Sequence, residues 1–364
     1  LNIMSNFKVL DCTIRDGGYY NNWDFSNRFA KDYLKTLSKI NIDYVEIGFR
    51  KPLEKKSQNQ KKFGQFLTTT EKTLKNFNIP PNLKLAVMIN LSDYSGISLK
   101  DKINDNFINS KKSKISIIRI ACTEKDLNTL KEVTKILKLK GYNFTVNLMQ
   151  FTTLPINRIS FFLNSCLKLG ADYAYIADSF GNCTPKKIKL ISSYLKKNQI
   201  ELKKIGFHAH DNTGQALKNS LTAIQNGFGI VDTSIMGMGR GAGNLDLIKF
   251  LNFYRLKKES KIIKNFSNKF MKKLKKLYKW GKNDFYNFSA KNNIHPTFVQ
   301  RMLDDKKFEK PYIIKIMNFL KLSNATKYDM NIFDDLFLKV KKFSHNEESF
   351  QFKNLIIFCD NSKI

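Results

Sequence analysis

The chain has 364 residues, of which 42% are hydrophobic, and it carries a formal net charge of +32. This length and apolar content exclude a disordered chain, and no apolar run reaches the roughly 18 residues that a membrane-spanning helix requires. The positive charge comes mostly from lysines spread along the chain without a nucleic-acid-binding motif, so we expect a solvated lysine surface, with neither a nucleic acid nor a membrane as partner.

Short apolar runs alternate with longer amphipathic stretches through the first 258 residues. The apolar runs predict strands over 7–13, 43–49, 83–89, 115–121, 142–149, 172–178, 203–210 and 229–236. The amphipathic stretches predict helices over 26–41, 63–77, 98–111, 124–140, 157–169, 185–199, 213–226 and 243–258. This alternation predicts an α/β fold of the (β/α)8 type, a TIM barrel. The competing doubly wound open sheet usually has a glycine-rich phosphate loop after its first strand, and DGGYYNN has neither its spacing nor a following helix start.

The pattern changes after residue 258. Residues 262–277 predict a basic amphipathic helix, whose apolar side chains we expect to pack on the barrel or on a second subunit of a homodimer rather than on a membrane. The apolar segments that follow predict a small helical appendage. We therefore expect a barrel over 7–258 and a mainly helical part over 259–364.

The cysteines and the N-terminus indicate a cytoplasmic protein. The five cysteines are odd in number and widely spaced, with no CxxC pair, which is typical of reduced thiols. The first residues, LNIMSNFKVL, lack the charged and apolar regions of a secretory signal.

Metal-ligating side chains occur at two predicted strand ends. The first strand ends in TIRD, with Arg15 and Asp16, and the seventh ends in GFHAHDN, with His208 and His210. Residues two apart on a strand point to the same side, so both imidazoles would face the barrel mouth, where TIM-barrel active sites lie. Two imidazoles and a carboxylate can bind a divalent cation and leave positions open for substrate. The alternative, two ordinary hydrogen-bonded histidines, leaves Asp16 unexplained.

We expect Arg15 and Asp16 to point to opposite faces of the strand and therefore not to form an ion pair. Gly17 and Gly18, which follow, would let a substrate lie against the backbone.

These motifs resemble those of the DRE-TIM metallolyase superfamily, which includes hydroxymethylglutaryl-CoA lyase, 4-hydroxy-2-oxovalerate aldolase and isopropylmalate synthase. The similarity rests on LDCTIRDGGYYNNWDF and on the segment from GFHAHDN to GRGAGNLDLI, and it runs from about residue 7 to 258. The resemblance implies that Asp16, His208 and His210 bind the cation, with Asn244 as a further ligand. It also implies that Arg15 contacts the substrate oxygen that becomes an enolate. The resemblance favours Mg²⁺ or Mn²⁺, and the ligand set also suits Zn²⁺ or Co²⁺.

Other polar residues at strand ends are candidates for binding or catalysis. Arginine is scarce, with eight residues in the chain, and its fixed fork suits carboxylate or phosphate. We predict substrate contacts for Arg50, Arg119, Asn147, Asp178, Ser179 and Arg240. A structural ion pair is the alternative for Arg50 and Arg240, and packing is the alternative for Asn147. Glu46 would orient Arg15 or take part in proton transfer.

The general base is where the sequence departs from the resemblance. The 4-hydroxy-2-oxovalerate aldolases have a histidine shortly after the Arg-Asp pair, where this chain has Tyr19. The hydroxymethylglutaryl-CoA lyases have a cysteine in the last loop, which reads GMGRGAGN here. Tyr19 or Tyr20 would act as the general base through a metal-bound water, or would simply stack under the loop. His295 would be a third candidate for the base.

The function we predict is a metal-dependent aldolase or lyase that acts on the bond beside the carbonyl of a 2-oxo acid, or on a similar hydroxylated anionic substrate, through an enolate. Two alternatives stay open at this point. One is a Claisen-type synthase that condenses an acyl-CoA with a 2-oxo acid. The other is a barrel without catalytic activity that acts as a scaffold or binds nucleic acid.

Overall fold

The computed structural model describes residues 6–40, 42–52, 63–96, 98–304, 308–331 and 334–336. The chain divides into two compact units, Leu1–Lys282 and Asn283–Ile364. The basic helix expected after residue 258 therefore belongs to the same unit as the barrel, and the predicted division after 258 falls inside the first unit.

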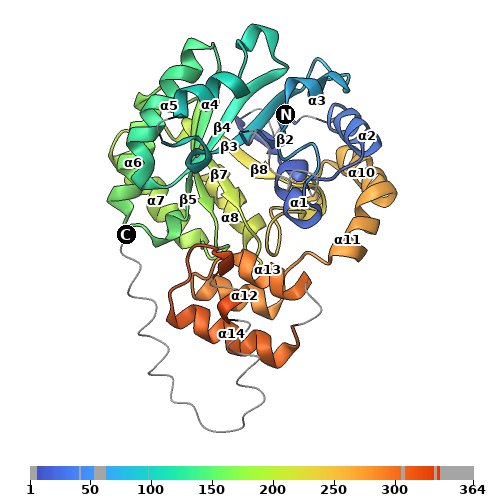
Figure 1. Ribbon diagram of the computed structural model, residues 1–364, viewed down its shortest axis with the longest axis vertical. Helices are drawn as coiled ribbons and strands as arrows, with labels where there is room; N and C mark the ends of the chain where they lie inside the picture. The colour runs from blue at the N-terminus through green and yellow to red at the C-terminus, as the bar shows by residue number, and fades with distance from the viewer. Residues whose placement is uncertain are drawn as a thin grey trace. The chain divides into compact units, whose positions relative to one another are not determined.

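Eight parallel strands form a closed barrel in chain order (Figure 1). They are β1 (Lys8–Asp11), β2 (Tyr44–Phe49), β3 (Lys84–Asn90), β4 (Ile115–Cys122), β5 (Asn143–Met149), β6 (Tyr173–Asp178), β7 (Ile205–Ala209) and β8 (Ile230–Thr233). The barrel closes where β8 pairs with β1, with Val231 opposite Val9. The predicted TIM barrel is confirmed, and each predicted strand overlaps an observed one.

Helices follow the strands and cover the outside of the barrel (Figure 1). They are α2 (Asn27–Leu37), α3 (Glu71–Lys75), α4 (Leu99–Asn106), α5 (Leu127–Leu139), α6 (Ile156–Lys168), α7 (Pro185–Lys197), α8 (Ala216–Gln225) and α9 (Leu247–Phe253). Ser26 and Thr184 cap α2 and α7 by accepting hydrogen bonds from backbone N–H groups three residues on. The main core lies between strands and helices, where for example Ile118 of β4 and Leu163 of α6 are fully buried.

The sequence TIRDGGYYN forms a helix, α1 (Thr13–Asn21), rather than the end of a strand as predicted. The strand β1 stops at Asp11, whose Oδ1 accepts hydrogen bonds from the Thr13 backbone N–H at 2.9 Å and from its hydroxyl at 2.6 Å. This contact satisfies one of the free amides at the start of the helix, so the chain turns into a helix directly after the strand. Arg15 and Asp16 therefore lie on a helix at the C-terminal end of β1.

Gly17 and Gly18 leave room for the protein's own side chains. A Cβ atom on Gly18 would lie 2.0 Å from Cδ1 of Trp23, whose Nε1 donates to the Arg15 carbonyl at 2.8 Å. A Cβ atom on Gly17 would lie 2.9 Å from Sδ of Met238. The expectation that these glycines admit a substrate to the backbone is therefore wrong, because Trp23 and Met238 occupy that space.

The basic amphipathic segment packs on the barrel helices. It consists of α10 (Lys257–Phe266), a π-helical turn (Ser267–Met271) and α11 (Lys272–Tyr278). The Phe266 and Phe270 rings lie 5.3 and 5.4 Å from the Phe29 ring of α2. Packing on the barrel, one of the two predicted options, is therefore observed for Phe266 and Phe270, whereas Leu277 at the end of the segment is exposed. In the part of the chain that the structure describes, no helix is long and apolar enough to cross a membrane.

The second unit is helical, with α12 (Asp284–Lys291), α13 (Pro296–Asp304) and α14 (Lys310–Leu322). His295 precedes α13, and its Nδ1 accepts a hydrogen bond from the Thr297 backbone N–H at 3.3 Å. The part of the predicted helical appendage that follows residue 331 lies mostly outside the described residues, as does Cys359. The other four cysteines are buried and form no disulfide.

Candidate active site

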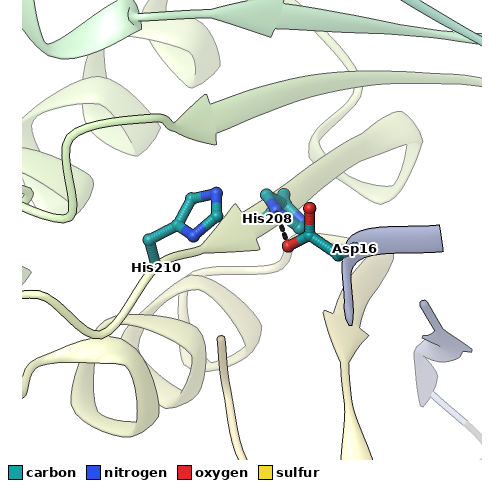
Figure 2. A group of neighbouring side chains, drawn as sticks. All are labelled: Asp16, His208 and His210. Atoms are coloured by element: carbon teal, nitrogen blue, oxygen red, sulfur yellow. Dashed lines mark ion pairs between the residues drawn. The ribbon is translucent and has the colours of Figure 1, made fainter. Parts of the chain in front are cut away.

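Three potential metal ligands converge at the C-terminal end of the barrel. Asp16 comes from α1, His208 from β7, and His210 directly follows β7 (Figure 2). Their ligand atoms all lie within 4.8 Å of one another, and all three side chains are buried. His208 Nε2 lies 3.8 Å from Asp16 Oδ2. The predicted triad is thus brought together in space.

Hydrogen bonding leaves the right atoms of this group available for a cation. His208 Nδ1 is bonded to Asp232 Oδ2 at 2.8 Å, which leaves His208 Nε2 facing Asp16. His210 Nδ1 and Asn244 Oδ1 are buried and have no hydrogen-bond partner among the described residues. Buried acceptors of this kind normally have a partner, and a divalent cation would supply one. The residues therefore fit a divalent metal.

The protonation states also suit metal binding. Burial raises the pKa of Asp16, but nearby positive charge, above all the Arg15 guanidinium, outweighs this effect and holds that pKa below its usual range. Burial lowers the pKa of His210 well below its usual value. At neutral pH the site therefore presents a carboxylate and a neutral imidazole, which are the forms that bind metals.

Asn244 is held beside the triad by the loop after β8. Its Nδ2 donates to Asp16 Oδ2 at 2.6 Å, and its backbone forms a β-bridge with His210. Gly243 makes this turn with φ +94°, and a Cβ atom there would lie 2.0 Å from the Gly237 carbonyl oxygen. The structure thus places the predicted fourth ligand next to the other three.

Arg15 is fixed by two carboxylates. Its Nε donates to Glu46 Oε2 at 2.6 Å and its Nη1 donates to Asp16 Oδ1 at 2.5 Å. The expectation that neighbouring Arg15 and Asp16 do not pair is wrong, because residues that follow one another in a helix lie about 100° apart around its axis, not on opposite faces. Nη2 of Arg15 is buried without a hydrogen-bond partner among the described residues. Glu46 is in contact with Arg15, as one of its two predicted roles requires.

A pocket opens beside the triad and Arg15. Its lining consists of Arg15, Asp16, Tyr19, Phe49, Met88, Asn90, Ala121, Asn147, Met149, Ala177, Ser179, His208, His210 and Arg240. Besides Arg15 and the triad, the lining includes four residues that were predicted to contact the substrate or to transfer a proton: Tyr19, Asn147, Ser179 and Arg240. Asn147 Oδ1 is buried without a hydrogen-bond partner in the described part of the chain.

Tyr19 and Arg240 lie against each other at this pocket. The Arg240 guanidinium lies 5.6 Å from the centre of the Tyr19 ring, and its Nη2 donates to the Ser179 carbonyl at 3.4 Å. Burial raises the pKa of the Tyr19 phenol, although the charge of Arg240 lowers it in part. Tyr19 is therefore a protonated phenol at neutral pH, which can donate a hydrogen bond or a proton.

Three predicted substrate-binding residues lie outside the pocket lining. Arg50 donates from Nε to the Thr69 carbonyl at 2.6 Å and pairs with Glu71 at 3.0 Å, so the alternative of a structural ion pair is the arrangement observed. Asp178 accepts hydrogen bonds from the backbone N–H groups of residues 182 and 183, both at 3.1 Å. Arg119 is fully buried among carboxylates inside the barrel.

Asp232 is a residue of this site that the sequence reading missed. It lies on β8, is almost fully buried and holds His208 from behind the triad. Burial raises the pKa of Asp232, but the positive charge of Arg119 and the hydrogen bond with His208 outweigh this effect and hold that pKa below its usual value. The sequence signal was an acid within the otherwise apolar strand sequence GIVDTSIM.

Comparison with known proteins identifies the family. A family model described as HMGL-like matches residues 6–269. The chain belongs to the HMGL-like family. It is thus an enzyme of the carbon–carbon lyase type, and the predicted resemblance is confirmed.

Relatives of known description agree with this family. A 4-hydroxy-2-oxovalerate aldolase of Carboxydothermus hydrogenoformans is 29% identical over 240 residues, which cover 65% of this chain and 67% of the aldolase. A 2-isopropylmalate synthase of Bacillus velezensis is 27% identical over 255 residues, which cover 67% of this chain and 46% of the synthase. Among solved structures, the N-terminal domain of a Bacteroides vulgatus protein described as an aldolase is 31% identical. It superposes with a TM-score of 0.70 and covers 85% of this chain and 100% of that domain.

Proposed function

We propose that the chain is a divalent-metal-dependent aldolase that cleaves or forms the carbon–carbon bond next to the carbonyl of a 2-oxo acid, through an enolate. The observation that carries this proposal is the convergence of Asp16, His208 and His210 beside a guanidinium, that of Arg15, which faces the same pocket. A divalent cation, Mg²⁺ or Mn²⁺, held by these three residues with Asn244 beside them would act as a Lewis acid on the substrate carbonyl.

Arg15 would stabilise the charge that develops on the substrate oxygen. Glu46 and Asp16 occupy its Nε and Nη1, so the guanidinium is held in place before the substrate arrives. Nη2, which has no partner among the described residues, is left to donate to the enolate oxygen. A donor that is already oriented in a buried site stabilises such a charge far better than water does.

The remaining polar groups of the pocket would bind the rest of the substrate. Asn147 Oδ1 is a buried acceptor without a partner in the described chain, and it would accept a hydrogen bond from a substrate hydroxyl. Arg240 would bind an anionic group such as a carboxylate. We therefore expect a hydroxylated, anionic substrate.

Tyr19 would transfer the proton at the hydroxyl next to the bond that breaks. Its phenol is protonated at neutral pH, so in the bond-forming direction it would donate to the carbonyl oxygen of the aldehyde. Donation leaves a Tyr19 phenolate, and in the cleavage direction this phenolate oxygen would take the proton from the substrate hydroxyl. This role requires a phenol hydroxyl but not a histidine at this position.

Enolisation of pyruvate tests the proposal without knowledge of the aldehyde. The protein is freed of metal with a chelator, reloaded with Mn²⁺ or Mg²⁺, and incubated with pyruvate in D₂O, and exchange of the methyl protons is followed by NMR. We expect exchange that requires the metal and is lost in Asp16→Ala. An equal rate for metal-free protein, reloaded protein and Asp16→Ala would contradict the proposal.

A Claisen-type synthase is the second candidate, and the similarity to a 2-isopropylmalate synthase favours it. Incubation with acetyl-CoA, a set of 2-oxo acids and a thiol reagent separates the two candidates. Release of free CoA that depends on the 2-oxo acid would favour the synthase, whereas cleavage of a 4-hydroxy-2-oxo acid to pyruvate would favour the aldolase.

A further inference from the structure

A closed ring of buried charged side chains links the two halves of the candidate site. Each member contacts the next, in the order Asp16, Arg15, Glu46, Arg119, Asp232 and His208, and His208 lies back beside Asp16. Negative and positive charges alternate from Asp16 to Asp232. We call the part of the ring formed by Asp232 and His208 the metal side, because His208 is a proposed metal ligand. We call the part formed by Glu46 and Arg15 the enolate side, because Arg15 is proposed to contact the enolate oxygen.

Arg119 is the member that the two sides share. Its Nη2 donates to Asp232 Oδ2 at 2.6 Å, and its Nη1 lies 3.1 Å from Glu46 Oε2. The guanidinium also lies 4.6 Å from the centre of the Tyr175 ring, and the side chains of Arg119, Glu46 and Asp232 are all fully buried. A buried charge among such partners is held firmly, because losing any partner leaves another charge unpaired.

The two carboxylates that Arg119 contacts each hold a different working group. Asp232 bonds His208 Nδ1 at 2.8 Å and so turns His208 Nε2 toward Asp16. Glu46 accepts from Arg15 Nε at 2.6 Å and so directs the rest of that guanidinium toward Asp16 and the pocket. Arg119 itself lies outside the pocket lining, so it can affect a substrate only through these neighbours.

We propose that Arg119 is a positioning residue that fixes the His208 imidazole through Asp232 and the Arg15 guanidinium through Glu46 at the same time. The proposal rests on the proposed function, because it explains how the metal side and the enolate side of that site are held in fixed positions relative to each other. Arginine is required because its planar fork reaches two carboxylates, whereas a lysine ammonium is a single point of charge.

The test compares Arg119→Lys with Arg50→Lys. Arg50 is a matched control, since it is also a buried arginine paired with a carboxylate, but it lies outside the ring and the pocket lining. Binding of Mn²⁺ to metal-free protein is measured by electron paramagnetic resonance, and deuterium exchange into pyruvate is measured at saturating Mn²⁺. For Arg119→Lys we expect Mn²⁺ binding about 10- to 100-fold weaker, the range for residues that orient metal ligands, and slower exchange even when the site is filled. Arg50→Lys should match wild type in both.

Two further variants test the two sides of the ring one at a time. They also provide the test if Arg119→Lys does not fold. Asp232→Asn should weaken Mn²⁺ binding more than it slows exchange at saturating Mn²⁺. Glu46→Gln should slow exchange at saturating Mn²⁺ more than it weakens binding. A purely structural role of Arg119 predicts changes in unfolding temperature without this split.

The outcomes are distinct. If folded Arg119→Lys binds Mn²⁺ and exchanges pyruvate as Arg50→Lys does, or if both single-sided variants behave as wild type, the inference is overturned while the proposed function stands. If wild type itself neither binds Mn²⁺ through Asp16 nor exchanges pyruvate protons, the proposed function fails first.

Discussion

The Nδ1 atom of His208 lies 2.8 Å from Oδ2 of Asp232, on the side of the imidazole away from Asp16. A carboxylate in this position makes Nδ1 the protonated nitrogen and leaves the lone pair on Nε2. Because Asp232 is itself held by Arg119, the orientation of His208 is determined by residues of β4 and β8 as well as by its own strand. This relationship connects the chemistry of the site with the closed barrel.

Removal of the Asp16 carboxylate should abolish metal retention. Asp16→Ala takes away one of the three converging ligands and leaves Arg15 Nη1 without its partner. We expect bound metal, measured by mass spectrometry of the purified protein, to fall from about one equivalent to a small fraction, with a loss of activity of at least about 100-fold. Asp32→Ala, which removes a surface partner of Lys269, is the control and should retain metal.

Arg15→Lys should separate metal binding from enolate stabilisation. Lysine keeps a positive charge near Asp16 but cannot contact Glu46, Asp16 and a substrate oxygen together. We expect metal content to be retained and deuterium exchange into pyruvate to slow by about 100- to 1,000-fold, the usual cost of losing an oriented donor. An exchange rate near that of wild type would show that Arg15 does not act on the enolate.

Tyr19→Phe should affect the aldehyde and leave the enolate largely intact. The variant keeps the ring that packs on Trp23, with ring centres 4.9 Å apart, and removes only the hydroxyl. We expect exchange into pyruvate to stay within about threefold of wild type, while addition of an aldehyde slows by about 100-fold or more. Equal slowing of both reactions would assign Tyr19 to the enolate step or to the structure of the pocket.

Gly18→Ala should destabilise the protein although alanine favours helices. Inside a helix, alanine is usually about 1 kcal/mol better than glycine. At this position, however, a Cβ atom would lie 2.0 Å from the Trp23 ring, so overpacking should outweigh that gain and cost about 1–3 kcal/mol in urea unfolding. Gly17→Ala meets the flexible Met238 side chain at 2.9 Å and should cost less. Equal or increased stability of Gly18→Ala would contradict the packing we describe.

Asp178 should make stability decrease as pH rises. Burial raises the pKa of Asp178 to about 7, above the value of about 4 that an unfolded aspartate has. Folding therefore favours its protonated form, so its contribution is full below about pH 4 and is lost as pH rises through 7. We expect the free energy of unfolding of wild type to fall relative to Asp178→Asn across this window, on the order of a few kcal/mol. Measuring the difference between the two proteins cancels the titration of the other carboxyl groups, and a difference independent of pH would contradict the raised pKa.

The barrel and the shared direction of His208 and His210 were predictable because their signals are local. Alternating apolar runs mark the strands, and two histidines at i and i+2 on one strand must point the same way. The helical path of α1 was not predictable, because consecutive glycines favour a turn and because the Asp11 carboxylate that starts the helix is also held from a distance by the hydroxyl of Tyr33.

The roles of the buried arginines were also out of reach of the sequence. Arg119 and Asp232 are 113 residues apart, and nothing local to either strand indicates the other. The same holds for Arg50, whose partner Glu71 comes from a separate helix. An arginine at a strand end is equally compatible with a bound anion and with an internal carboxylate, and only the packing of the barrel distinguishes the two.

The hydrogen bond from Asn244 to Asp16 joins residues 228 positions apart, so the site is assembled from the two ends of the barrel sequence. A nascent chain on the ribosome would hold Asp16 long before β8 and its loop are made. No partial barrel can therefore offer the complete set of ligands, and a cation that binds this set stabilises only the closed form. Metal supply would thus protect the finished enzyme against unfolding and proteolysis without assisting its early folding intermediates.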